Sequence, residues 1–312
     1  MAGVKLITIN ERFVMKKYLF FFVASLFLVS AAFAADSQIW DAMRIQNILG
    51  YGQEESLKLG PLFTMLQSTW FYKIFLGILI GVPAVFFVHY LIIGPKVFSH
   101  DGTPIFAFTV FKRIIHALAA IAFTILIPTG LMIVFGKYLG GGTLIEYARH
   151  LHGIATIMFA ISVVPMFLFW FVPMLPTLYD IKWVFILGGY LSKEIKEIPA
   201  GQFNAGQKMW FWIATFGGFI MIATGATMYL QDFDYGIAKA LGVTQIDLLR
   251  ASAIVHNVLA FAIMAFFFTH VYMAAIAIKG AIYSMITGYK EHNEVKYLHS
   301  IWYKQMKKDG KI

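Results

Sequence analysis

The chain alternates between long apolar stretches and shorter polar segments. Five apolar stretches lie near residues 71–93, 114–134, 153–172, 209–228 and 251–278. Each is about long enough to cross a bilayer as a helix, which takes about 20 mostly apolar residues. Inside a membrane, helices satisfy their own backbone polar groups, whereas irregular segments do not. The pattern therefore predicts an all-α membrane protein, a helical bundle with five transmembrane helices.

A shorter apolar run lies near the start of the chain. Residues 15–34 read MKKYLFFFVASLFLVSAAFA, with two lysines, an apolar run and a small-x-small end before Ala35. This order is typical of a bacterial secretory signal peptide. The residues before Met15 lack it, which favours Met15 as the true start. An uncleaved anchor helix is the alternative, and in both cases Ala35 begins outside the cytoplasm.

The distribution of basic residues predicts the same orientation. With Ala35 outside, the segments after the first, third and fifth spans face the cytoplasm, and they carry fourteen Lys and Arg residues. The other side has six, namely Arg44, Lys58, Lys137, Arg149, Lys239 and Arg250. Cytoplasmic loops carry such an excess. We expect a multi-pass protein of the bacterial inner membrane, with its mature N-terminus in the periplasm and its C-terminus in the cytoplasm.

The composition limits the chemistry of the protein. Hydrophobic residues make up 60% of the 312 and charged residues 13%, whereas soluble domains are about 25% charged. The net charge of +9 is explained by the cytoplasmic segments, so membrane lipid and not nucleic acid is the expected partner. The chain has no cysteine, which excludes c-type haem attachment, thiolate-held iron–sulfur clusters and disulfides. If the chain moves electrons, histidine-ligated haem remains.

Four histidines lie in or near the apolar stretches at two depths. His256 and His270 are fourteen residues apart, close to four helical turns. They therefore face the same side of the last span and lie about 21 Å apart along its axis. In the predicted topology His116 shares the cytoplasmic depth of His270, and His152 shares the periplasmic depth of His256. Two imidazoles at one depth can hold a haem iron from both sides. This pattern predicts two haem groups that carry electrons only.

The other histidines are interpreted differently. His150 is two residues from His152, so only one of them can face a haem, and we favour His152. His89 has no partner at its depth and is interpreted as a packed or interfacial residue. Three further histidines are expected in solvent, namely His100, His292 and His299.

Arginines and small residues lie near the predicted ligands. Arg113, Arg149 and Arg250 each lie within two helical turns of a ligand, where they could reach haem propionates or, alternatively, only anchor helix ends. Glycines inside the spans would let helices or a flat porphyrin approach closely, namely Gly130, Gly217, Gly218 and Gly225. Tryptophans near span ends are expected to form interface belts, namely Trp70, Trp170, Trp210 and Trp212.

The fourth span opens with a polar sequence on the predicted cytoplasmic side. Residues 204–208 read NAGQK, level with His116 and His270. Asn204 could cap the helix, and Gly206 could let a ligand approach amides without intrahelical partners. A quinone carbonyl accepts such hydrogen bonds. A polar helix start without a ligand is the alternative.

These motifs resemble the membrane cytochrome b (gamma) subunits of bacterial respiratory formate dehydrogenases, within the wider group of hydrogenase and thiosulfate reductase b-type cytochromes. The resemblance covers about residues 111–303. It rests on KRIIH at 112–116, RHLH at 149–152, NAGQK at 204–208, HVYM at 270–273 and the spacing of His256 and His270. The NAGQK sequence and this spacing are its specific parts.

The resemblance implies a set of cofactor ligands. His152 and His256 would bind a periplasmic haem b, and His116 and His270 would bind a cytoplasmic haem b. The fold would be a four-helix diheme core.

The resemblance also implies a substrate and partners. A menaquinone site would form from Asn204, Gly206 and the neighbourhood of His270. The partners would be an iron–sulfur subunit and a molybdenum or tungsten catalytic subunit, neither of which this chain encodes. The chain would pass electrons from formate to menaquinone without oxidising formate itself.

The expected organisation has five parts. They are a signal peptide (1–34), a periplasmic segment (35–69), an extra transmembrane helix with a cytoplasmic loop (70–110), the diheme core (111–280) and a cytoplasmic tail (281–312). The extra helix departs from the pattern of the family, because shorter relatives begin with the helix that bears the first ligand. The alternatives are a b-type cytochrome of a hydrogenase or a thiosulfate or polysulfide reductase, and a haem-free anchor or transporter.

Overall fold

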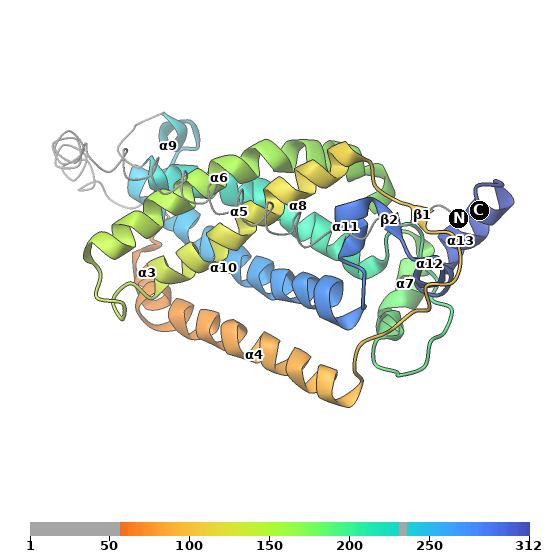
Figure 1. Ribbon diagram of the computed structural model, residues 1–312. Coiled ribbons are helices and arrows are strands. Elements are labelled where there is room, and N and C mark those ends of the chain that lie inside the picture. Colours follow the sequence, from red (N-terminus) through yellow and green to blue (C-terminus); the bar gives the residue numbers. More distant parts are fainter. Residues whose placement is uncertain (1–56, 231–235) are drawn as a thin grey trace, which may run out of the picture.

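The computed structural model describes residues 57–230 and 236–312. The predicted signal peptide and most of the predicted periplasmic segment lie outside the described residues. Within the described ranges, five helical segments are long and apolar enough to cross a membrane, which confirms the predicted all-α membrane fold. They are Gly60–Ile92, Val110–Val134, Gly142–Trp170, Ala205–Tyr229 and Gln245–Ala277. They form an elongated bundle with short elements at its ends (Figure 1).

The first span contains α3 (Gly60–Met65), the π-helical η1 (Leu66–Trp70) and α4 (Phe71–Ile92). The next two are α5 (Val110–Val134) and α6 (Gly142–Trp170). The fourth is α8 (Ala205–Tyr229), and the fifth is α10 (Gln245–Tyr272), which continues as the π-helical η4 (Met273–Ala277).

All five spans begin before the apolar stretches that predicted them, and three of these helix starts have a side-chain cap. Thr109 caps α5 by accepting a hydrogen bond from the Lys112 amide. Asn204 caps α8 and Thr244 caps α10, each in a reciprocal capping box. The polar first turn of each helix is therefore held by side-chain hydrogen bonds to the backbone, which hydropathy does not detect.

The bundle is built from two closely packed helix pairs. α5 packs along α6, and α8 packs along α10, while α6 also contacts α8. At the contact between α6 and α8, a Cβ on Gly218 would lie 2.8 Å from the Phe159 ring. Glycine is therefore needed at 218 for this helix approach, whereas a Cβ on Gly217 would meet nothing within 4 Å.

The helix α4 packs mainly along one edge of α10 (Figure 1). Phe75 contacts Phe261 with ring centroids 4.6 Å apart, and Phe86 stacks on Tyr272 at 4.4 Å. Nε2 of His89 donates to the Tyr190 carbonyl at 2.8 Å, and its Nδ1 lies 2.6 Å from the Tyr272 hydroxyl. His89 is thus a packed residue that ties α4 to α10.

Several short elements form a layer at one end of the bundle, which we call the cap (Figure 1). Its antiparallel ribbon pairs β1 (Ile105–Phe106) with β2 (Tyr289–Lys290). Its helical elements are η2 (Val172–Met174), α7 (Leu178–Phe185), η3 (Leu187–Gly189), α11 (Tyr283–Thr287), α12 (His292–Leu298) and α13 (Ser300–Lys308). The short α9 (Ile237–Ala240) lies at the other end.

One histidine of the cap corrects the sequence analysis. His299 was expected in solvent, but it is 2% exposed. Its Nδ1 donates to the Gly201 carbonyl at 2.8 Å, and its Nε2 lies 3.4 Å from Nζ of Lys290, which pairs with Glu294 at 2.6 Å. Burial, followed by the charge of Lys290, lowers the pKa of His299 to about 3, although the bond to Gly201 opposes the shift. The prediction was wrong because α12 and α13 fold back against the loop before α8.

The other two histidines of this region differ in exposure. The side chain of His100 is 79% exposed and pairs with Glu291 at 2.9 Å, so it lies in solvent as expected. His292 is half-buried, with Nε2 3.0 Å from the Tyr303 hydroxyl.

Candidate functional site

The four histidines singled out by the sequence form two facing pairs. His116 of α5 and His270 of α10 have ring centroids 6.1 Å apart, and we call them the cap-side pair. His152 of α6 and His256 of α10 have ring centroids 6.5 Å apart, and we call them the far-side pair. Three helices thus bring the side chains together at two levels of the bundle.

The separation within each pair suits a metal between two imidazoles. A bond of about 2 Å from metal to nitrogen, plus about 1 Å from nitrogen to ring centre, places two centroids about 6 Å apart. Both pairs have this separation. Within the described ranges, no group of three or more His, Cys, Asp or Glu side chains is placed to hold a metal ion. The ring separation in each pair is therefore compatible with a haem iron held by one imidazole from either side.

The far-side pair is held by hydrogen bonds from neighbouring helices. Thr129 of α5 lies 2.9 Å from Nδ1 of His152, and Thr224 of α8 lies 3.0 Å from Nδ1 of His256. The adjacent glycines provide space for the rings, because a Cβ on Gly130 or Gly225 would lie 3.4 or 3.3 Å from Cε1 of the same histidine. Only Nε2 of each ring remains for a metal.

The cap-side pair has a different environment. The indole of Trp210 stacks on His270 with centroids 5.5 Å apart and planes 22° apart. No hydrogen bond from either imidazole to another described residue is present. The sequence analysis expected Trp210 in an interface belt, but the indole packs inside the bundle, against Phe123 and Phe267. Only the tertiary fold brings this part of α8 next to His270.

The three arginines named from the sequence differ in their contacts. Arg113 donates through Nη1 to the Ile286 carbonyl of α11, while its Nε is buried without a partner. Arg149 is exposed on α6 and Arg250 is half-buried on α10.

The NAGQK sequence forms the first turn of α8. The Asn204 side chain accepts from the Gln207 amide at 2.9 Å, and the Gln207 side chain accepts from the Asn204 amide at 2.9 Å. A Cβ on Gly206 would lie 2.9 Å from the Trp183 ring. The predicted helix cap is therefore present, but the space beside Gly206 is filled by the indole of α7.

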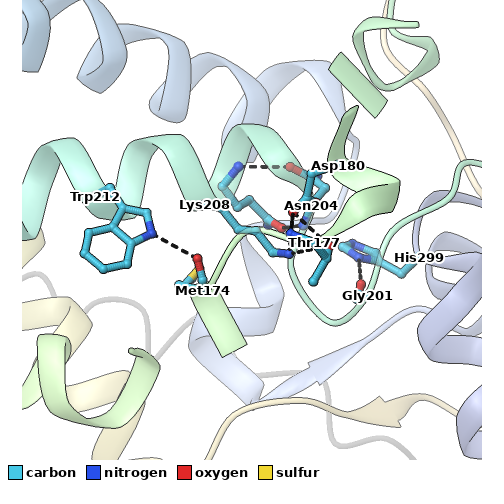
Figure 2. Close-up of polar contacts among 9 residues, drawn as sticks. Met174, Thr177, Asp180, Gly201, Asn204, Lys208, Trp212 and His299 are labelled. Carbon is cyan, nitrogen blue, oxygen red and sulfur yellow. Dashed lines mark hydrogen bonds and ion pairs between the residues drawn. The ribbon is translucent and has the colours of Figure 1, made fainter. Parts of the chain in front are cut away.

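The lysine of this sequence belongs to a buried ion pair that sequence reasoning missed (Figure 2). Nζ of Lys208 lies 2.7 Å from Oδ2 of Asp180 and 3.1 Å from the Thr177 hydroxyl, and both charged side chains are nearly inaccessible. The second carboxylate oxygen of Asp180 is buried without a hydrogen-bond partner. The capping-box spacing of Thr177 and Asp180 was a usable signal for the start of α7, but their contact with α8 is tertiary.

Neighbouring hydrogen bonds hold the loops around this ion pair (Figure 2). Trp212 donates from Nε1 to the Met174 carbonyl at 3.0 Å. His299 donates to the Gly201 carbonyl, three residues before Asn204. The start of α8 is thus fixed by contacts with three parts of the cap, namely η2, α7 and the residue before α13.

Comparison with known proteins places this bundle in a family. The chain matches the prokaryotic cytochrome b561 family over residues 107–288, more than half of its length. It is 25% identical over 197 residues to the formate dehydrogenase cytochrome b556 subunit of Haemophilus influenzae, covering 62% of this chain and 79% of the relative.

Two relatives from Escherichia coli show similar levels of identity. The formate dehydrogenase cytochrome b556(fdo) subunit is 26% identical over 212 residues, with 64% of this chain and 92% of the relative covered. The nitrate-inducible cytochrome b556(Fdn) subunit is 27% identical over 164 residues, with 52% and 72% covered. The family match contains α5, α6, α8 and α10 but not α4. With this match and its five membrane-spanning helices, the chain belongs to the prokaryotic cytochrome b561 family of haem b-binding electron-transport proteins.

Proposed function

We propose that this chain is the cytochrome b subunit of a formate dehydrogenase and carries electrons across the membrane to a quinone. The observation that carries the proposal is the presence of two histidine pairs, each with the ring separation that suits one iron. All four histidines lie inside the family match, and the named relatives are formate dehydrogenase subunits. Bound haem b would supply a one-electron carrier at each pair.

The two pairs are proposed as the axial ligands of two haems b. His152 and His256 would hold one iron, and His116 and His270 the other. Two imidazoles leave no open coordination position for oxygen or a substrate. His150, the competitor of His152, has its Nδ1 3.4 Å from the Tyr229 hydroxyl, a contact that supports the choice of His152.

The cap is proposed to face the cytoplasm of the bacterial inner membrane. Its last helix, α13, carries Lys307 and Lys308 in its final turn, and the charge distribution along the chain favours this side. The far-side pair and the mature N-terminus would then lie toward the periplasm. The C-terminus would lie in the cytoplasm.

The quinone, expected to be menaquinone, is proposed to bind near the start of α8 and the cap-side pair. Quinone reduction consumes protons, so its site needs polar groups within an apolar region. Asn204 and Lys208 are such groups, one turn apart at the start of α8, and Lys208 is paired with the buried Asp180 of α7. Gly206 would contribute by admitting the Trp183 ring, which shapes this site, and not by exposing amides on that side.

The three arginines are proposed to bind haem propionates. Arg113 is favoured for the cap-side haem because its buried Nε lacks a partner and it lies one turn before His116. Arg149 and Arg250 would serve the far-side haem.

The proposed partners are an iron–sulfur subunit and a molybdenum or tungsten catalytic subunit. Electrons from formate oxidised outside would enter at the far-side pair and leave at the cap-side pair. Protons for the quinol would come from the cytoplasm. Inward electron movement and proton uptake from inside would together make the reaction electrogenic, with each charge that crosses 100 mV equivalent to about 2.3 kcal/mol. In proteoliposomes, formate-dependent quinone reduction should therefore create a membrane potential, and its absence would refute this direction of transfer.

The central test is a reduced-minus-oxidised spectrum with haem quantification on the purified complex. We expect two low-spin b haems in the wild type and one in each of the variants His116→Ala and His256→Ala. Absence of haem from the wild type would refute the proposal and favour a haem-free anchor or transporter. The large subunit that co-purifies decides the partner, since a hydrogenase or a thiosulfate or polysulfide reductase would replace the formate dehydrogenase assignment.

A further inference from the structure

The two histidines of the far-side pair have matching neighbours on two different helices. A threonine followed by a glycine, Thr129–Gly130, faces His152 from α5. The same dipeptide, Thr224–Gly225, faces His256 from α8. The two threonine–Nδ1 distances differ by 0.1 Å, being 2.9 and 3.0 Å. The two packed helix pairs of the bundle thus present the same contact to the two rings.

The direction of these hydrogen bonds follows from the other contacts of the threonines. The Thr129 hydroxyl lies 2.7 Å from the Ile125 carbonyl, and the Thr224 hydroxyl lies 2.8 Å from the Ile220 carbonyl. A carbonyl oxygen only accepts, so each hydroxyl gives its single proton to its own helix. The hydroxyl oxygen can then only accept from Nδ1–H of the histidine. Each far-side imidazole is therefore held with its proton on Nδ1 and with Nε2 free for iron.

The glycines make this geometry possible. A Cβ at either position would lie within 3.8 Å of Nδ1 and closer still to Cε1 of the facing ring. The ring edge therefore rests against the backbone of the neighbouring helix, and its orientation is restricted from two directions. The cap-side pair has no such hydrogen bonds to described residues and is contacted by the Trp210 ring instead.

We infer that Thr129 and Thr224 are positioning residues that fix the far-side ligands and lower the reduction potential of the iron these ligands hold. An imidazole that donates from Nδ1 is a more basic ligand, and a more basic ligand stabilises the oxidised iron. The threonines thus favour electron transfer from the far-side pair to the cap-side pair. This inference rests on the proposed function, because it requires bound haem.

The experiment is a redox titration of the purified complex with Thr129→Val, Thr224→Val and the double variant. Valine has nearly the shape of threonine but cannot accept the hydrogen bond. We expect each single variant to shift the reduction equilibrium of the far-side haem toward reduced iron by about threefold to tenfold. This corresponds to a potential higher by roughly 30 to 60 mV for one electron. The double variant should show about twice the shift, and the electron paramagnetic resonance signal of this haem should change. The cap-side potential should stay constant.

Matched controls separate this effect from general disturbance of the helices. Thr124 of α5 and Thr215 of α8 make the same bond to a carbonyl of their own helix but no hydrogen bond to a described histidine, so Thr124→Val and Thr215→Val should shift neither potential. The variants Thr129→Ser and Thr224→Ser keep the hydroxyl and should retain the wild-type potential. If a valine variant loses the far-side haem while its serine variant keeps it, the hydrogen bond is again supported.

Two results would overturn the inference. One is an unchanged potential and resonance signal in both valine variants with two haems bound. The other is loss of the far-side haem in the serine and valine variants alike, which would indicate a steric role. Absence of haem from the wild type is a separate outcome, which refutes the proposed function itself.

Discussion

The far-side and cap-side pairs have the same residue types but different surroundings. The far-side rings are bonded to threonines of the neighbouring helices, deep in the regular part of the bundle. The cap-side rings lie near Trp210 and near the start of α8, where a buried ion pair and the cap elements meet. Under the proposed function, the far-side pair would hold a haem in a fixed position, and the cap-side pair would hold a haem next to an exchangeable quinone. The same residue types would thus serve two tasks because their neighbours differ.

The largest effect is expected from a change near the cap-side pair. Lys208→Met should lower the free energy of unfolding by about 3–5 kcal/mol, because it leaves the Asp180 carboxylate buried without its partner. Thermal unfolding of the detergent-solubilised complex measures the loss, and quinone reduction should fall while the far-side haem spectrum is retained.

Two further variants make this prediction specific to the ion pair. The double variant Lys208→Met with Asp180→Asn should recover part of the stability, since the amide keeps the helix cap and removes the charge. Lys182→Met, at an exposed position of α7, is the matched control and should have no measurable effect. Equal loss in the double and single variants would argue against the buried charge as the cause.

A smaller effect is expected from a change that should affect both histidine pairs alike. Gly218 lies on α8 between the two pairs, so Gly218→Ala should disturb both haem spectra together. The added Cβ meets the buried Phe159 ring, and overpacking of this kind costs about 1–3 kcal/mol. Gly217→Ala, one residue away in open space, is the control for thermal unfolding. Similar unfolding temperatures for the two variants would mean that the helices adjust freely.

The pH dependence of stability should distinguish the cap from the bundle. The folded pKa of His299, about 3, lies below its ordinary value of 6.5. Between these values the unfolded chain binds a proton that the folded chain does not, so this residue's contribution to stability is complete above pH 6.5 and is lost as pH falls. The slope approaches about 1.4 kcal/mol per pH unit at most.

The measurement is unfolding of the solubilised complex between pH 7 and about pH 5, with the wild type compared to His299→Gln. The variant should show a shallower dependence on pH. If the stabilities of the wild type and the variant fall equally with pH, His299 takes up its proton in the folded cap, and the prediction is wrong. His100→Gln, a change at an exposed histidine, serves as the control.

The smallest effect tests the tryptophan contact. Trp210→Leu removes the ring that stacks on His270 but no hydrogen bond of either cap-side histidine. We expect a shift of the cap-side haem potential equivalent to about threefold or less, roughly 30 mV, with the far-side potential unchanged. Redox titration of the complex measures both. A larger shift at the far-side pair would contradict the separate control of the two levels.

Much of the fold followed from hydropathy alone. The five spans were predicted because a lipid environment demands long apolar helices. The five long apolar helices of the structure confirm this prediction. The helix starts were missed by several residues, since Asn204 and Thr244 hold polar first turns by local hydrogen bonds. The sequence also placed the candidate histidines at two depths, because helical rise converts spacing into depth.

Sequence patterns did not predict the contacts between helices. The burial of His299, the stacking of Trp210 on His270 and the pairing of Lys208 with Asp180 all join segments far apart in the chain. The Thr129 and Thr224 contacts are of the same kind, although the repeated Thr–Gly dipeptide is visible in the sequence.

By itself, the sequence determined the class of fold, the approximate spans and the expected level of each candidate histidine along its helix, because these depend on the length and periodicity of apolar segments. Only the tertiary structure decided which nitrogen of each far-side histidine is free, what fills the space beside Gly206 and which charges are buried. These properties depend on side chains from different helices meeting at distances of about 3 Å, and helical periodicity along one segment carries no information about its neighbours.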